Sequence, residues 1–95
     1  MNKHMVEVLD ITLTNGLFVM LDGVADGAQL FGPPQTEGHL RRLRAGTCDV
    51  LFMLLGLAHD ADLDEDSQEK LHELVNQTLQ YFSDALKSGI FEEPA

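Results

Sequence analysis

Four aspartates between positions 60 and 66 have the alternate spacing of the first four ligands in a helix–loop–helix calcium site. They are Asp60, Asp62, Asp64 and Asp66. Such a loop also requires a glycine at its sixth position and a bidentate glutamate at its twelfth, and those positions hold Glu65 and Leu71 here. We therefore interpret residues 59–66 as the acidic, solvated start of a helix, while weak binding of a divalent ion stays open.

The remaining residues that could bind a metal or act as nucleophiles do not form a known constellation. The histidines show no i, i+4 pair, and the single cysteine forms no Cys-x-x-Cys motif. Cys48 lies among apolar residues next to Asp49, surroundings that do not activate a thiol. The serines lack the Gly-x-Ser-x-Gly turn of a hydrolase nucleophile. We therefore predict no catalytic residue, no metal ligand and no cofactor, and we expect a protein that is not an enzyme.

The chain carries a large excess of negative charge. Its 16 acidic residues stand against 6 basic ones, which gives a formal net charge of −10. A field of this sign repels phosphate backbones and anionic lipid surfaces, and it favours a basic protein surface. We therefore expect a protein partner rather than nucleic acid or a membrane.

Half of the basic residues are concentrated in one short segment, at Arg41, Arg42 and Arg44. This cluster could bind a phosphate or an acidic partner. The alternative, which we favour, is that it pairs with surplus acids of the same chain, such as Glu37 or Asp49.

The sequence also bears on the compartment in which the protein works. A single cysteine cannot form an intramolecular disulfide, which fits a reducing compartment. Glu7 and Asp10 follow the N-terminal Met1–His4 closely, a pattern that is poor as a signal peptide. The longest apolar run, Val50–Ala58, is shorter than the roughly 20 residues that a membrane span needs. We expect a cytoplasmic protein.

The C-terminal part of the chain has the clearest helical pattern, with one apolar stripe and one polar side. The stripe consists of Leu71, Val75, Thr78, Leu79, Phe82 and Leu86. Asp66 and Glu69 have capping-box spacing at its start, and Lys87 with Gly89 marks its end. This pattern predicts a helix over residues 66–88.

A second helix is predicted over residues 37–58, after a Gly-Pro-Pro break and with Thr36 as its cap. Its main stripe consists of Leu40, Leu43, Thr47, Val50, Leu54 and Leu57. The segment Val50–Leu55 is apolar on all sides, and such a segment must be covered all round. Two neighbouring helices in a small chain do not provide that cover, so we expect a second subunit to do so.

The first segment has features of both a helix and a hairpin. A helical stripe passes through Val6, Leu9, Leu13, Leu17, Met20 and Val24. The alternating pattern around Asn15-Gly16 is a strong hairpin signal. The helix is favoured because the stripe keeps its phase through this dipeptide, and because residues 17–25 are similar to residues 51–58. We predict a helix over residues 4–28, with Gly23 as an alternative, earlier end, and we leave a hairpin over residues 9–21 as the alternative fold of this segment.

Together these elements predict an all-α fold with three antiparallel helices, because short connections make successive helices neighbours. The chain length predicts a single domain over residues 1–95, with residues 90–95 as a tail. A chain of this size buries only about 60–65% of its unfolded surface, so we expect dimerisation to complete the bundle.

Apolar residues outside the main stripes define a predicted interface. A three-helix monomer with one core would leave many of them exposed, and contiguous exposed apolar patches mark binding sites. The alternative is a central helix that is fully buried within a compact monomer. The predicted interface residues are Ile11, Phe18, Cys48, Leu51, Phe52, Met53 and Leu55.

Two functions follow as hypotheses. The first is a homodimeric, non-catalytic protein that binds another protein as a regulator, adaptor or chaperone-like partner. The second is an acidic inhibitor, of the immunity, antitoxin or phage-inhibitor type, that blocks a basic functional surface by mimicking nucleic-acid charge. The acidic surface predicted for a partner consists of Asp60, Asp62, Asp64, Glu65 and Asp66.

Overall fold

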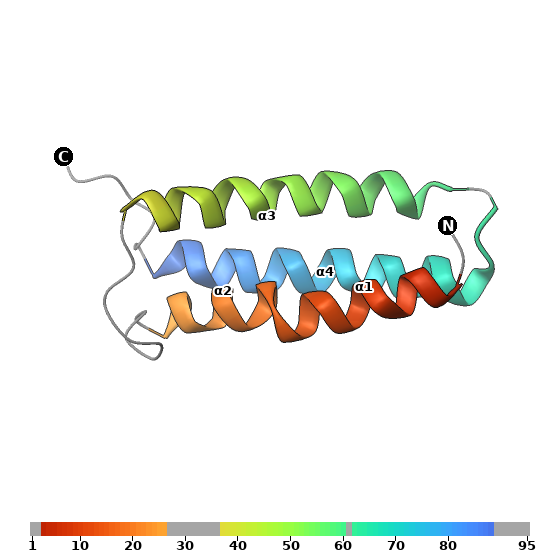
Figure 1. The fold of residues 1–95 in the computed structure, drawn as a ribbon, viewed down its shortest axis with the longest axis horizontal. Helices are drawn as coiled ribbons and strands as arrows, with labels where there is room; N and C mark the ends of the chain where they lie inside the picture. The colour runs from red at the N-terminus through yellow and green to blue at the C-terminus, as the bar shows by residue number, and fades with distance from the viewer. Residues whose placement is uncertain (1–2, 27–36, 61, 89–95) are drawn as a thin grey trace.

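The computed structural model describes residues 3–26, 37–60 and 62–88. These residues form helices α1 (Lys3–Asn15), α2 (Leu17–Ala25), α3 (Glu37–Ala58) and α4 (Glu65–Lys87) (Figure 1). The all-α prediction is confirmed, and no described residue forms a strand. Since the chain is helical on both sides of Gly16, the hairpin alternative for residues 9–21 is wrong.

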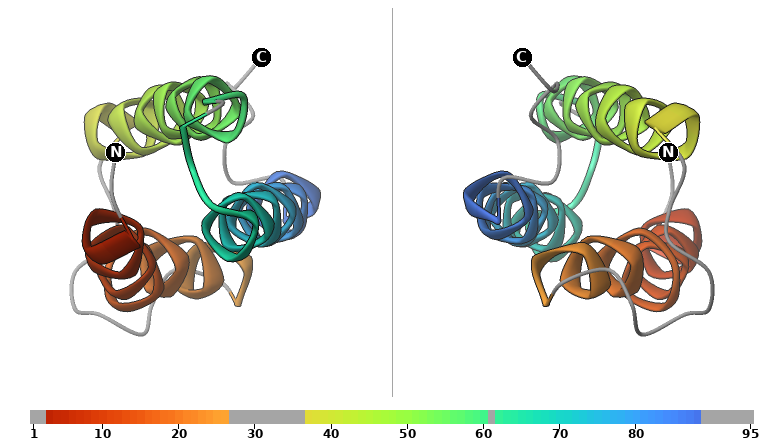
Figure 2. Two further views of the ribbon diagram at one scale, coloured as in Figure 1. Left: turned by 90° about the vertical axis from the view of Figure 1, so that its right-hand side faces the viewer. Right: turned by 90° about the vertical axis from the view of Figure 1, so that its left-hand side faces the viewer.

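The helices alternate in direction along the bundle. α1 and α2 follow one another in a single N-terminal arm, α3 returns antiparallel to that arm, and α4 reverses again (Figure 1). α4 packs against each of the other helices, whereas α1 packs against α2 and α4. End views show α3 and the N-terminal arm on different sides of α4 (Figure 2). The predicted antiparallel arrangement of three helical segments is confirmed, with α4 as the element that joins the others.

The N-terminal arm is interrupted at Gly16, between α1 and α2. Gly16 has φ −121° and ψ −87°, outside the α-helical range, and its carbonyl accepts the N–H of Met20 at 3.1 Å. A Cβ at Gly16 would lie 2.9 Å from the carbonyl oxygen of Thr12, so only glycine fits here without a shift. The prediction of one unbroken helix over residues 4–28 is therefore wrong in two respects: the helix breaks at Gly16, and α2 ends at Ala25.

The break changes which side of the arm faces the core. Before it, Val6 and Leu13 are buried as the stripe predicts. After it, Phe18 and Leu21 are buried, whereas Met20 of the predicted stripe is 51% exposed. An unbroken helix would carry the phase of Leu13 on to Met20. The change of backbone direction at Gly16 therefore rotates α2 relative to α1. As a result Phe18 and Leu21, in place of Met20, face the core.

Two clusters of apolar side chains form the core. The larger joins α1, α2, α3 and α4 along the middle of the bundle, and the smaller joins α2 to the C-terminal part of α4. The larger consists of Val6, Leu13, Phe18, Leu54, Ala58, Leu63, Leu71, Leu74 and Val75, and the smaller of Leu21, Val24 and Ala85. Thr47 and Thr78 are also fully buried, and each hydroxyl donates to a carbonyl four residues earlier at 2.7 Å. These bonds satisfy the buried hydroxyls.

The N-cap of α4 lies two residues before Asp66, the start of the predicted capping box. Its N-cap is Asp64, whose carboxylate accepts the backbone N–H of Ser67 at 2.7 Å. At its other end the Ser88 hydroxyl donates to the carbonyl of Ala85 at 2.6 Å, and the predicted C-cap Gly89 lies outside the described residues. The cap Thr36 predicted for α3 lies outside them too. The predicted bounds of this helix, residues 66–88, agree with the observed Glu65–Lys87 to within a residue.

Candidate functional site

α3 presents an apolar patch to solvent. Phe52 is 76% exposed, more than any other large apolar side chain among the described residues. Met53 and Leu55 beside it are 43% and 44% exposed, and Cys48 and Leu51 are half-buried. We call these five residues the α3 patch. All five were predicted as interface residues, and the structure brings them together on one helix.

The α3 patch is exposed because α3 is covered on one side only. Thr47, Leu54 and Ala58 are buried on the inward side, which packs against α4. With about 100° of rotation per residue, Phe52 points away from Leu54. The expectation that a monomer leaves this all-apolar segment incompletely covered is therefore met by the structure.

Phe18 does not belong to this surface, which corrects the prediction. It is 3% exposed, and its ring stacks on Tyr81 of α4 with 4.8 Å between ring centroids and 15° between ring planes. The arm rotates at Gly16, and this rotation turns Phe18 toward α4 instead of solvent. Phe18 is thus a core residue that joins α2 to α4.

Ile11 is exposed as predicted, but it lies on a different helix. Its side chain is 61% exposed on α1, which packs against α2 and α4. Other apolar side chains outside the predicted interface are also exposed, and three of them, Met20, Leu79 and Leu86, were predicted to lie in the covered stripes. They are Met5, Val8, Val19 and Met20 on the arm, and Leu79 and Leu86 on α4.

The N-terminal arm as a whole is long and apolar, although its uninterrupted apolar runs are short. Lys3–Ala25 is 23 residues long, and its length and composition would allow it to cross a membrane. In its most apolar 18-residue window, 28% is buried in the fold. A core helix of a soluble protein and a signal sequence share these features, so the cytoplasmic location stays a prediction.

The acidic segment forms the start of α4. Asp62, Asp64, Glu65 and Asp66 are exposed, and Asp60 is half-buried. The Asp60 carboxylate accepts the N–H of Asp62 at 3.0 Å, and its carbonyl accepts the side-chain amide of Gln68 at 3.1 Å. These contacts order the turn before α4 without directing the aspartates toward a common centre. The interpretation of this segment as an acidic helix start is consistent with this geometry.

Asp64 is the structural carboxylate of this segment. Hydrogen bonds from the side chain and the backbone N–H of Ser67 lower the pKa of Asp64 below its ordinary value. Ser67, whose N–H donates to this carboxylate, is 3% exposed. The exposed carboxylates of Asp62, Glu65 and Asp66 surround the positive end of the helix dipole, which stabilises them there.

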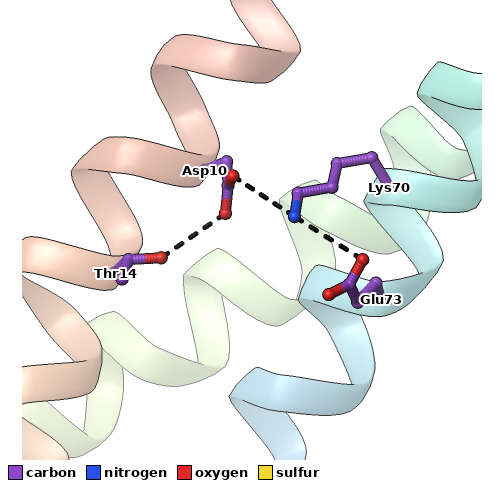
Figure 3. Close-up of polar contacts among 4 residues, drawn as sticks. All are labelled: Asp10, Thr14, Lys70 and Glu73. Atoms are coloured by element: carbon purple, nitrogen blue, oxygen red, sulfur yellow. Dashed lines mark hydrogen bonds and ion pairs between the residues drawn. The ribbon is translucent and has the colours of Figure 1, made fainter.

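A second charged group connects α1 to α4. The ammonium group of Lys70 lies 3.3 Å from the Asp10 carboxylate and 3.5 Å from that of Glu73 (Figure 3). Thr14 donates a longer hydrogen bond to Asp10, at 3.4 Å. Partial burial opposes the charge on Lys70, but the hydrogen bond and charge of Asp10, aided by Glu73, outweigh it and raise the pKa of Lys70. This group ties the arm to α4.

Two hollows of the described surface are lined mostly by polar and charged residues. One, of about 200 Å³, lies between α1 and α4 and is lined by charged side chains that include Glu7, Asp66 and Lys70. Another, of about 660 Å³, is a shallow hollow along the outer side of α4. Within residues 3–26, 37–60 and 62–88, no three His, Cys, Asp or Glu side chains are grouped so that they could hold a metal ion. The apolar α3 patch is therefore the best candidate for a functional surface.

No known family model, curated protein or solved structure matches this chain.

Proposed function

We propose that the protein is a non-catalytic protein–protein interaction module that forms a homodimer through the α3 patch and serves as a regulator, adaptor or chaperone-like protein. The observation that carries this proposal is the 76% exposure of Phe52 within a group of apolar side chains. Aromatic residues and methionine are typical of interface cores. Solvent gives these side chains no favourable contact, whereas burial against a second surface does.

The proposal is tested by sedimentation of the wild-type chain and of three Glu variants over a wide range of micromolar concentration. Phe52→Glu places a charge at the centre of the α3 patch. An interface hot spot contributes about 2 kcal/mol or more, so this variant should bind its second copy at least about 30-fold more weakly.

Val19→Glu is the matched control, because Val19 is a 44% exposed apolar residue on α2. It should self-associate like the wild type. Ile11→Glu reports whether α1 contributes to the interface, as the sequence predicted. A wild-type chain that stays monomeric throughout, or a Phe52→Glu variant that dimerises as tightly as Val19→Glu, would contradict the proposal.

A second candidate function rests on the exposed carboxylates at the start of α4. Asp62, Glu65 and Asp66 are exposed and close in sequence, and the protein as a whole is strongly acidic. These charges support an inhibitor that blocks a basic functional surface. Such binding would depend strongly on salt, since exposed charges are screened by ions.

This second function is tested with a triple variant, Asp62→Asn, Glu65→Gln and Asp66→Asn, which leaves the cap residue Asp64 intact. A basic protein that the wild type captures at low salt should be lost with the variant and in high salt. Asp22→Asn with Asp49→Asn and Glu69→Gln, at exposed positions elsewhere on the helices, removes the same three charges and is the control. Capture that is equal for all three proteins would remove this candidate.

A further inference from the structure

The outward side of α3 has the residue spacing of a coiled-coil seam. Positions separated alternately by three and four residues run the length of the helix, and we call them the outer stripe. They are Gly38, Arg41, Ala45, Cys48, Phe52, Leu55 and His59. All of them are exposed except Cys48, which is half-buried. In a coiled coil such positions are apolar, as they are in the middle of this stripe at Ala45, Cys48, Phe52 and Leu55.

The outer stripe differs in size between its two ends. Two of the three residues in its N-terminal half, Gly38 and Ala45, are small, and the third is Arg41. Its C-terminal half contains the larger residues Phe52, Leu55 and His59. Two copies in opposite directions would place Phe52 of each against the level of Ala45 of the other. Large side chains would then fill the space above small ones, as packing at protein density requires. Parallel copies would instead oppose large to large and small to small.

The charge along α3 differs in the same direction. Arg41, Arg42 and Arg44 are exposed near its start, whereas the half-buried Asp60 and the exposed Asp62 follow the end of the helix. Antiparallel copies bring the basic part of each α3 toward the acidic part of the other. Parallel copies bring three arginines against three arginines, and such like-charge contacts are unfavourable.

Gly56 leaves open space for a second helix on this side. It is exposed within α3, next to the outer stripe, and a Cβ added there would meet nothing within 4 Å. The fold of one chain therefore does not require glycine at this position, although glycine weakens a helix interior relative to alanine. A small residue allows the backbones of two helices to come close.

We propose that a second copy of the chain packs antiparallel along the outer stripe, with the two-fold axis close to Cys48. This inference rests on the proposed function, since it specifies how the α3 patch is occupied. Centring the axis on the stripe gives the longest overlap of the two helices, about 32 Å at 1.5 Å per residue. It also places Phe52 opposite Ala45, and it brings Arg41 of one copy to within about one helical turn of Asp60 of the other.

The orientation is tested by distances between spin labels in the full chain. Two single-cysteine variants, Gly38→Cys and His59→Cys, are each prepared with Cys48→Ser, and they are measured alone and as an equal mixture. Both labels lie at exposed ends of the outer stripe. Sedimentation and circular dichroism of the labelled proteins establish that they fold and dimerise as the wild type does.

Antiparallel pairing predicts that each variant alone gives a long distance, about 32 Å from the 21 steps of helix rise between positions 38 and 59. The mixture should add a short distance, close to the separation of two packed helices, about 8–10 Å plus the label arms. Short distances in each variant alone would show parallel pairing, which overturns this inference and leaves the proposed dimer standing.

Dimers that show no short distance in any sample would place the contact on another surface, and they would overturn the inference together with the assignment of the α3 patch. Monomers in the sedimentation experiment would overturn both the inference and the proposed function.

Discussion

Replacing Phe18 by alanine should destabilise the protein much more than the same replacement at Phe52. Phe18 is 3% exposed and stacks on Tyr81, whereas Phe52 is 76% exposed. Truncation of a buried phenylalanine costs about 3–5 kcal/mol, of which a ring pair accounts for roughly 0.5–1.5 kcal/mol. Truncation of an exposed side chain usually changes the stability by less than about 0.5 kcal/mol. The expected difference between these chemically identical changes is therefore about 2.5 kcal/mol or more.

Urea unfolding, followed by circular dichroism of the helices, measures this difference. With an m-value of about 1 kcal/mol/M for a small domain, the Phe18→Ala midpoint should fall by about 3 M. Phe18→Leu is the milder variant, with an expected loss below about 1.5 kcal/mol if the cavity repacks. It keeps the measurement possible if Phe18→Ala is too unstable to fold.

Protein concentration separates the two sites further. A dimer gains stability by mass action, so the effect of Phe52→Ala should grow as the protein concentration rises. The effect of Phe18→Ala acts within one chain and should appear at the lowest concentration. Equal midpoint shifts for the two variants in dilute solution would refute the placement of Phe18 in the core and of Phe52 on the surface.

Three further predictions concern the backbone and the charged groups. Gly46→Ala should raise the free energy of unfolding by about 0.8–1 kcal/mol, because the added Cβ meets nothing within 4 Å. Gly16→Ala should lower the free energy of unfolding, because the added Cβ would lie 2.9 Å from a backbone oxygen. Melting temperatures that move in the same direction for both variants would contradict this. Asp64→Ala should lower the melting temperature at neutral pH and Asp64→Asn should preserve it. Because folding lowers the pKa of Asp64, the contribution of its charge to stability is present above the ordinary pKa of 3.8 and is lost as the pH falls through the lower pKa of the folded state. The melting temperatures of both variants should therefore depend less on pH in that window than that of the wild type. Lys70→Gln should cost at most about 1 kcal/mol, and this cost should shrink in high salt. Because folding raises the pKa of Lys70, the contribution of its charge to stability is present below pH 10.5 and should vanish as the pH rises through the higher pKa of the folded state. A loss of stability in Lys70→Gln that persists above that pH would show that packing and not charge is responsible.

Much of the helical structure could be predicted from the sequence, because its signals are local. The bounds of α3 agree with the predicted residues 37–58, since the Gly-Pro-Pro break and the periodic leucines depend on neighbours along the chain. The acidic start of α4 was also predicted, because carboxylates are favourable at a helix N-terminus whatever the rest of the fold. The exposure of Phe52 followed from an apolar segment too broad for one core.

The direction in which each apolar face points was decided by the tertiary structure. In α4, Leu79 and Leu86 of the predicted stripe are 49% and 44% exposed, whereas Leu74 and Ala85 are fully buried. α4 packs against the arm as well as α3, so its buried face is shifted toward both neighbours. The helical period allows either Leu79 and Leu86 or Leu74 and Ala85 to face the core. Only the positions of the neighbouring helices select between these two sets.

The same distinction applies to the two phenylalanines of the predicted interface. Composition and periodicity alone determined that this chain has more apolar side chains than three short helices can cover, because those properties depend only on the order of residues. Phe18 is covered because the break at Gly16 turns α2 toward α4, whereas Phe52 is exposed because α3 is covered on one side only. A rotation of this kind is set by contacts between residues distant in the chain, and the spacing of residues along one helix carries no record of it.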